Sequence, residues 1–261
     1  MFRAYVALAL LFAGSASGAT PSYSAATIVN AANGAPGPFA PNSILAIYGS
    51  GLARGTQGVV SSDIRGGFLP TELNSTAVYV GDASGGIPAP LFYVSDTQIN
   101  FVLPGTVGPD PVVITVVREG QHGPPATIAL APAAPALFTN PTGYVLASRV
   151  DYSVITPDTP ARPGDTVILW CTGLGKTSPR NPQPGELPNF TAQVADLTSL
   201  QVTVGGVAVD SAHILYAGLT PLSAALYQIN LVLPTTLPTD PEIRVSLSGQ
   251  TSAAGAKLAA P

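Results

Sequence analysis

The 261-residue chain has little charge and few of the side chains that usually carry chemistry. Charged residues make up 9% of it, the net charge is −4, and it contains two histidines and one cysteine. Because a nucleic-acid-binding surface needs a basic field to hold the phosphate backbone, we expect no nucleic-acid partner. A single cysteine, Cys171, excludes an internal disulfide. The cores must therefore be stable through apolar burial.

Long apolar runs and helical periodicity are also missing. Outside residues 1–18, no window of ten or more residues keeps a 3.6-residue apolar period without an interrupting proline or glycine, so helices should be single turns. The apolar run from Ala4 to Ala13 is about ten residues, against roughly 20 for a membrane-spanning helix. It follows Arg3 and precedes small residues, which predicts a secretory signal peptide at 1–18. We expect a secreted chain, periplasmic or extracellular, with no membrane span after cleavage.

One segment of the chain occurs twice. The sequence YVSDTQINFVLP at 93–104 returns as ALYQINLVLP at 225–234. More weakly, PNSILAIYGSGL from Pro41 aligns with PGDTVILWCTGL from Pro163, and the order is the same in both halves. Repeated segments in preserved order indicate a duplicated unit, so we predict two related domains in tandem.

The predicted domains fit the length of the chain. Domains of about 100 to 150 residues are the commonest size, and we place the first at 19–139 and the second at 140–261. Between the repeats, closely spaced prolines stiffen the chain, which favours a fixed angle between the domains. Two short strands, Tyr144–Ala147 and Tyr152–Ile155, are expected near the start of the second domain.

Short apolar runs joined by glycine and proline predict an all-β protein. The main expected strands are Ser43–Tyr48, Thr76–Val80, Gln98–Leu103, Pro111–Val117, Thr166–Trp170, Gln201–Val204 and Glu242–Leu247. In the first Gln-Ile-Asn segment, Ile99, Phe101 and Leu103 share one face and form the core side, while Gln98, Asn100 and Val102 share the other. We expect each Gln-Ile-Asn strand to form a hairpin with the strand that follows.

Three sequence patterns together resemble a known family. They are a strand ending in Gly-x-Gly-Leu at Gly49–Leu52, a Val-x-Val-Gly-Gly turn at Val202–Gly206, and the Ile-Asn-x-x-x-Pro strands at Ile99–Pro104 and Ile229–Pro234. This pattern resembles the IPT/TIG immunoglobulin-like fold. Over residues 27–247, the chain is similar to an uncharacterised domain family at the C-termini of large secreted proteins of soil-dwelling bacteria. The resemblance implies two tandem immunoglobulin-like β-sandwich domains and no assigned activity.

The candidate catalytic motifs are incomplete. Gly175-Lys176-Thr177 matches the end of a phosphate-binding loop, but Trp170 stands where its first glycine is required, so nucleotide binding is not expected. A Ser-His-Asp hydrolase could use only His122 or His213, and no Gly-x-Ser-x-Gly motif is present. We interpret His122 as a solvated turn residue and His213 as a strand residue.

The acidic residues give no cofactor or metal assignment. No EF-hand spacing and no closely spaced glutamate pair occurs. Asp151, Asp158 and Asp165 could meet around Ca²⁺ near the domain junction, but calcium needs six or more oxygen ligands, and this reading is not favoured. We therefore assign no catalytic, cofactor or metal residue and expect no enzyme.

Repeated amides and scattered aromatic rings leave two readings open. The side chains of Gln98, Asn100, Gln228 and Asn230 could bind sugars, but we favour a role in capping loop backbone groups. Trp170 with Tyr144, Tyr152, Tyr216 and Tyr227 could form a glycan platform, but we favour burial, both for Trp170 and for Tyr48 at the matching position. Cys171 should face the opposite side of its strand and be inert.

The sequence thus predicts a secreted, non-catalytic β-sandwich module for extracellular protein interaction, adhesion or cell-surface structure. Its partner would be an extracellular protein or a cell-envelope component, and its binding residues are unknown. The alternative is a carbohydrate-binding accessory module with a glycan partner. A hydrolase that uses His213 is the third and least favoured reading.

Overall fold

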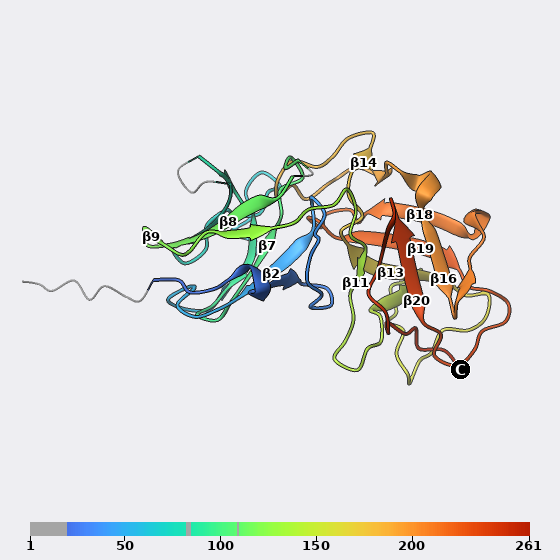
Figure 1. Ribbon diagram of the computed structural model, residues 1–261. Coiled ribbons are helices and arrows are strands. Elements are labelled where there is room, and N and C mark those ends of the chain that lie inside the picture. The colour runs from blue at the N-terminus through green and yellow to red at the C-terminus, as the bar shows by residue number, and fades with distance from the viewer. Residues whose placement is uncertain (1–19, 82–84, 109) are drawn as a thin grey trace, which may run out of the picture.

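The computed structural model describes residues 20–81, 85–108 and 110–261, so the predicted leader lies outside the described residues. Regular structure in the described part is almost entirely β (Figure 1). Helical residues there occur only as three single 3₁₀ turns: η1 (Ala25–Thr27), η2 (Leu197–Ser199) and η3 (Ser211–His213). The expectation of short helical turns is confirmed, because proline and glycine interrupt every longer apolar pattern. No helix among the described residues is long and apolar enough to cross a membrane.

The first sandwich consists of two antiparallel sheets. One has the order β1 (Ile28–Asn30), β2 (Ile44–Tyr48), β7 (Gln98–Val102), β6 (Leu91–Val94) and β3 (Gln57–Gly58). The other has the order β10 (Ala126–Ile128), β8 (Val112–Arg118), β4 (Thr76–Val80) and β5 (Ile87–Pro88), and β9 (Gln121–His122) pairs with β8. Leu45, Val78, Phe101 and Ile114 are fully buried between the sheets.

The second sandwich repeats this plan. Its larger sheet has the order β11 (Ala136–Leu137), β13 (Thr166–Thr172), β19 (Tyr227–Val232), β18 (Ile214–Leu219), β15 (Gln193–Val194) and β14 (Thr177–Ser178), and β12 (Ala147–Arg149) pairs with β13. Its smaller sheet has the order β17 (Val207–Ala208), β16 (Gln201–Val204), β20 (Ile243–Leu247) and β21 (Gln250–Thr251). The predicted fold class, all-β with two tandem immunoglobulin-like sandwiches, is confirmed. The boundary at 139/140 stays a prediction.

The segment after this boundary contains less strand than expected. Only β12 forms a strand there, and Tyr144, Val145 and Val154 take part in isolated bridges. Arg149 N–H bonds to the Ser153 carbonyl at 2.9 Å and closes a tight turn. The predicted strand Tyr144–Ala147 therefore consists of isolated bridges at Tyr144 and Val145 and the first residue of β12. The predicted strand Tyr152–Ile155 forms a single bridge, from Val154 to Ser148 of β12.

The two Gln-Ile-Asn strands, β7 and β19, lie in the middle of their sheets. β7 pairs with β2 and β6, and β19 pairs with β13 and β18. Ile99, Phe101 and Leu103 are fully buried, so the predicted core face is confirmed. The predicted hairpins are wrong, because the next strands, β8 and β20, belong to the facing sheets. Pro104 and Pro234 follow these strands and, because proline has no N–H, they cannot continue the ladder as donors.

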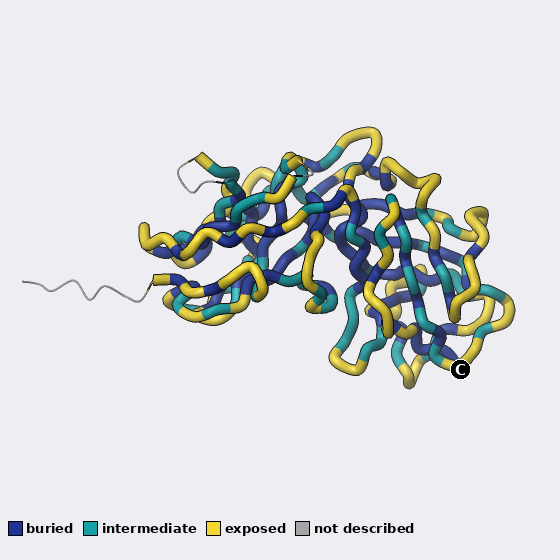
Figure 2. The backbone as a smooth tube through the Cα atoms, viewed as in Figure 1, coloured by how far each residue is buried: buried dark blue, intermediate teal, exposed yellow. Residues whose placement is uncertain are grey.

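A third apolar cluster joins the sandwiches. It contains Leu69, Val102, Ala224 and Ala225, with Ile44, Val59, Ile64, Phe92 and Leu187 packed against it. Beside it, the Asn42 Nδ2 group donates a hydrogen bond to the Tyr227 hydroxyl at 2.9 Å. Figure 2 shows buried backbone continuing from one sandwich into the other. These buried contacts fix the sandwiches against each other.

Two loops with the same Gly-x-Leu-Pro sequence meet at this junction. One begins at Gly67 and the other at Gly185. The Leu69 N–H bonds to the Gly185 carbonyl at 2.9 Å, and the Leu187 N–H bonds to the Gly67 carbonyl at 2.8 Å. The leucine of each loop thus donates to the glycine of the other, and the Gly-x-Leu-Pro sequence is a further part of the internal repeat.

Candidate binding face

The outer side of the first sandwich's larger sheet carries two amides between two tyrosines. Since Ile99 and Phe101 point into the core, Gln98 and Asn100 point away from it. Tyr48 lies directly opposite Gln98 on β2, and Tyr93 lies opposite Asn100 on β6. Directly paired residues of antiparallel strands share a face, so the four side chains are neighbours. We call Tyr48, Tyr93, Gln98 and Asn100 the first-copy face.

The amides of this face bond to each other. The Gln98 Nε2 group donates to Asn100 Oδ1 at 2.9 Å. The favoured reading, that these amides cap loop backbone, is therefore wrong, because the loop contacts are made by Ser95, whose hydroxyl accepts from the Gln98 N–H at 2.9 Å. The pair leaves Gln98 Oε1 as an acceptor and Asn100 Nδ2 as a donor, both on a partly exposed surface.

The tyrosines of the first-copy face are open to solvent. Tyr48 is 46% exposed, and Tyr93 is partly exposed. The predicted burial of Tyr48 is wrong, because Leu45 and Ile47 fill the core side of β2 and the strand's alternation turns Tyr48 outward. Neither tyrosine hydroxyl has a hydrogen-bond partner in the described part of the chain. Two rings and two amides thus present flat apolar surface beside hydrogen-bonding groups.

The second sandwich has the same four positions with different surroundings. Trp170 lies opposite Gln228, and Tyr216 lies opposite Asn230. The Gln228 Nε2 group again donates to the neighbouring asparagine Oδ1, at 3.0 Å. Trp170 is partly exposed, so its predicted burial in the core is also wrong, for the same reason of strand alternation. We call Trp170, Tyr216, Gln228 and Asn230 the second-copy face.

The second-copy face is less available to a ligand. Gln228 is only 9% exposed. The Tyr216 hydroxyl donates to the carbonyls of Ala192 and Leu219 at 3.1 and 2.8 Å, so it is already engaged. Burial raises the pKa of Tyr216, and the hydrogen bond to Ala192 partly offsets that rise. Its phenol is held as a structural group.

The other tyrosines do not form a shared platform with Trp170. Tyr227 is fully buried in the second core, and burial raises the pKa of its hydroxyl well above the usual range. Tyr152 lies at a turn and is 67% exposed. The Tyr144 hydroxyl bonds to Asp240 at 2.7 Å, a contact that raises its pKa. These three rings thus have separate roles.

The structure also places the candidate catalytic residues apart. His122 is exposed in β9, and His213 is exposed at the end of η3, not in a strand as predicted. The Asp210 carboxylate caps the start of that turn by accepting from the Ala212 N–H at 2.9 Å, and His213 is its last residue. Burial raises the pKa of the Cys171 thiol well above its usual range, which keeps it protonated and inert.

Two of the three aspartates considered for calcium have other partners. The Asp151 carboxylate accepts from the Ser153 hydroxyl at 2.7 Å, which lowers its pKa. Asp165 lies 3.8 Å from the Arg149 guanidinium and accepts from the Arg162 N–H at 2.9 Å. Among the described residues, no three His, Cys, Asp or Glu side chains form a metal-binding group.

The correspondence of Tyr93 with Tyr216 was missed from the sequence. In both copies, one extra residue bulges from the strand beside the Gln-Ile-Asn strand, between Leu91 and Tyr93 and between Ile214 and Tyr216. The short matching sequences LFYV and ILYA were the available signal. The bulge turns each tyrosine onto the asparagine's face.

Comparisons with known proteins found weak similarity to solved structures alone. No family model matches the chain, and no curated protein matches it. SGBP-B from a xyloglucan utilization locus of Bacteroides uniformis is 10% identical over 92% of this chain and 50% of its own, with a TM-score of 0.29. Bacteroides ovatus SGBP-B, in complex with a mixed-linkage heptasaccharide, is 13% identical over 84% of this chain and 42% of its own, with a TM-score of 0.33. The plexin A4 extracellular region is 12% identical over 100% of this chain and 20% of its own, with a TM-score of 0.30. The chain therefore spans half or less of each of these structures.

Proposed function

We propose that the chain is a secreted, non-catalytic carbohydrate-binding module that recognises neutral polysaccharide through the first-copy face. The observation that carries this proposal is the exposed Tyr48 and the partly exposed Tyr93, beside the bonded amides Gln98 and Asn100. A tyrosine ring offers a rigid apolar surface with a polar tip, which suits the apolar face of a sugar ring and its hydroxyls. The proposed carbohydrate binding rests on this face. The proposed secretion rests on the predicted signal peptide at 1–18.

The chemistry of the face favours an uncharged ligand. Its four side chains carry no charge, and the free amide oxygen and amide N–H groups can accept from and donate to neighbouring sugar hydroxyls. The face lies on strands in the middle of a sheet, which hold side chains more rigidly than loops do. A rigid face loses little conformational entropy on binding. Extended glucans, xylans and mannans are the ligand class that this surface fits.

The test is calorimetric titration of the mature chain with oligosaccharides from neutral glucans, xylans and mannans. We expect saturable binding to at least one of them and about tenfold weaker binding after Tyr48→Ala or Tyr93→Ala, since central aromatic contacts often carry most of the binding energy. Trp170→Phe is the matched control in the other copy. The glycan affinity of Trp170→Phe should stay within about twofold of that of the unmodified chain.

Two outcomes would contradict the proposal. One is the absence of binding to every glycan in the panel, with capture of a specific cell-envelope protein instead, which would restore the protein-interaction reading. The other is glycan binding that quenches tryptophan fluorescence and is lost in Trp170→Phe but kept in Tyr48→Ala. Because Trp170 is the only tryptophan, this signal assigns binding to the second-copy face.

A further inference from the structure

A cleft opens between the sandwiches, away from both faces described above. Its volume is about 490 Å³. The first sandwich contributes Pro41 and Val107, the connecting segment contributes Pro132, and the second sandwich contributes Leu174, Lys176 and Ala195. Ligand sites occur preferentially at such domain junctions. Most of this lining is aliphatic.

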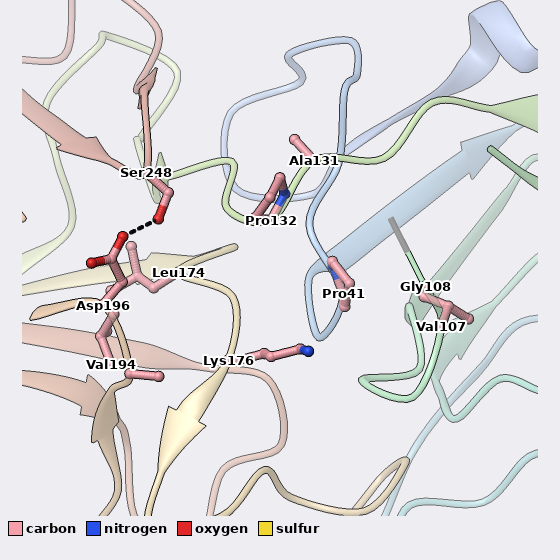
Figure 3. A pocket seen from close by; sticks show the side chains of 11 residues that line it. Pro41, Val107, Gly108, Ala131, Pro132, Leu174, Lys176, Val194, Asp196 and Ser248 are labelled. Carbon is pink, nitrogen blue, oxygen red and sulfur yellow. Dashed lines mark hydrogen bonds between the residues drawn. The ribbon is translucent and has the colours of Figure 1, made fainter. Parts of the chain in front are cut away.

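One cation projects into this apolar cleft. Figure 3 shows the Lys176 ammonium extending from the second sandwich toward Pro41 and the loop that carries Val107. Among the described residues, its side chain has no ion-pair or hydrogen-bond partner. Lys176 is exposed, and its ammonium group beside aliphatic walls is available to a ligand anion.

The backbone holds Lys176 in this position. Gly175 has a φ of +75°, and a side chain there would collide with the Pro132 carbonyl. The Tyr227 hydroxyl donates to the Gly175 carbonyl at 2.6 Å, and the Ala195 N–H donates to the Lys176 carbonyl at 2.8 Å. These contacts fix the backbone at Lys176 against the connecting segment and against Ala195 of the same sandwich.

The one carboxylate in the lining already has its own donors. Asp196 Oδ2 accepts from the hydroxyls of Ser199 and Ser248 at 2.5 and 2.6 Å, and these bonds lower the pKa of Asp196. Figure 3 shows the Asp196 carboxylate turned toward Ser248, on the far side of the cleft from the Lys176 ammonium. Asp196 is thus held by its own donors, and Lys176 is the charged group of the lining that has no partner among the described residues.

We infer that this cleft binds a small anionic amphiphile, with its carboxylate on Lys176 and its aliphatic body against the proline, valine and leucine walls. The charge complementarity and the aliphatic lining define this ligand class together, since a sugar would leave the walls unfilled and a neutral alkane would leave the ammonium unpaired. The site is independent of the first-copy face and of glycan binding.

Decanoate is the probe for the test, because it combines one carboxylate with an aliphatic chain. Titration calorimetry below its micelle concentration should show one saturable site. Lys176→Met keeps the aliphatic stem and removes the charge, and should weaken binding about tenfold, the effect of one favourable charge contact. Lys257→Met is the matched control, since Lys257 is the only other lysine, is exposed and does not line the cleft.

Two further arms locate the site and identify its chemistry. Ala195→Phe fills the cleft from an exposed position and should abolish decanoate binding without loss of folding. Decyltrimethylammonium has the same body with the opposite charge, and acetate has the head without the body, so both should bind at least about tenfold more weakly. Equal decanoate binding by Lys176→Met, equal binding of the two decyl compounds, or no saturable binding would overturn the inference.

Discussion

The two copies of the sheet present the same four positions to solvent in different states. In the first copy, Tyr48 is 46% exposed and the amide pair is partly exposed, whereas in the second the matching Gln228 is 9% exposed. Tyr216 has two hydrogen bonds through its hydroxyl, while its counterpart Tyr93 has none in the described residues. The duplicated frame thus leaves one face open, which is the face that we propose for binding, and hydrogen-bonds the other within its own sandwich.

The largest expected difference in stability between the two copies is at the junction. Val102 of β7 is fully buried in the cluster between the sandwiches, while the matching Val232 of β19 is partly exposed. Val102→Asp should therefore lower the free energy of unfolding by at least about 3 kcal/mol, because it places an unpaired charge in an apolar contact. Val232→Asp should lower it by less than about 1 kcal/mol. Urea unfolding measures both, and equal losses would show that the junction is not a buried apolar contact.

The tyrosine pair tests whether the second-copy face is structural. Tyr216→Phe removes the hydroxyl proton that the carbonyls of Ala192 and Leu219 share, which should cost about 1 kcal/mol of stability. Tyr93→Phe should leave stability within about 0.5 kcal/mol, since its hydroxyl meets water. Thermal unfolding of the two variants side by side is the measurement. A larger loss in Tyr93→Phe would reverse the assignment of the two faces.

Substitution of Asn230 should affect stability, whereas substitution of Asn100 should affect glycan binding. Asn230→Ala leaves the Gln228 amide buried without its 3.0 Å partner, so the melting temperature should fall, with a loss of about 1 kcal/mol. Asn100→Ala leaves Gln98 in contact with water and should cost less than about 0.5 kcal/mol, but it should weaken glycan binding. An unchanged melting temperature for Asn230→Ala would contradict the structural role of the second pair.

The sequence predicted the strands better than the faces. Periodicity of two gave the core side of Gln98–Leu103 correctly, because Ile99 and Phe101 alternate with amides. The segment 44–48 has an almost continuous apolar run, so alternation alone did not reveal that Tyr48 points outward. Ile44 is apolar because it packs against the junction, a contact that no local pattern contains.

The candidate site depended on pairing between strands distant in sequence. Tyr93 reaches Asn100 only because the strand bulges after Leu91, and a one-residue shift of register would turn the ring to the core. The predicted hairpins failed for a related reason, since the crossover to the facing sheet is fixed by tertiary packing. Local pattern thus identified which residues form strands, and the packing of the two sheets determined which side chains meet.

Acid should weaken the junction slightly through the loop that begins at Gly185. Its Glu186 carboxylate bonds to Arg180 at 2.6 Å and accepts from the Gln183 N–H at 2.8 Å. The hydrogen bond to Arg180 is the main cause of a Glu186 pKa below its ordinary value of 4.5. A carboxyl with a lowered folded pKa stabilises the fold above its unfolded pKa, and this contribution is lost as pH falls through the folded pKa.

Glu186→Gln tests that contribution, and the first copy supplies the control. The pair is partly open to water, since the Arg180 side chain is 48% exposed, so its removal should cost less than about 1 kcal/mol at pH 7. The difference from the unmodified chain should shrink as pH falls below about 4.5. Phe68→Leu, at the matching position of the first loop, keeps an uncharged side chain and should leave the pH dependence unchanged. Urea midpoints from pH 7 to pH 3 measure both, and a constant difference for Glu186→Gln across that range would show that the ion pair adds nothing to the junction.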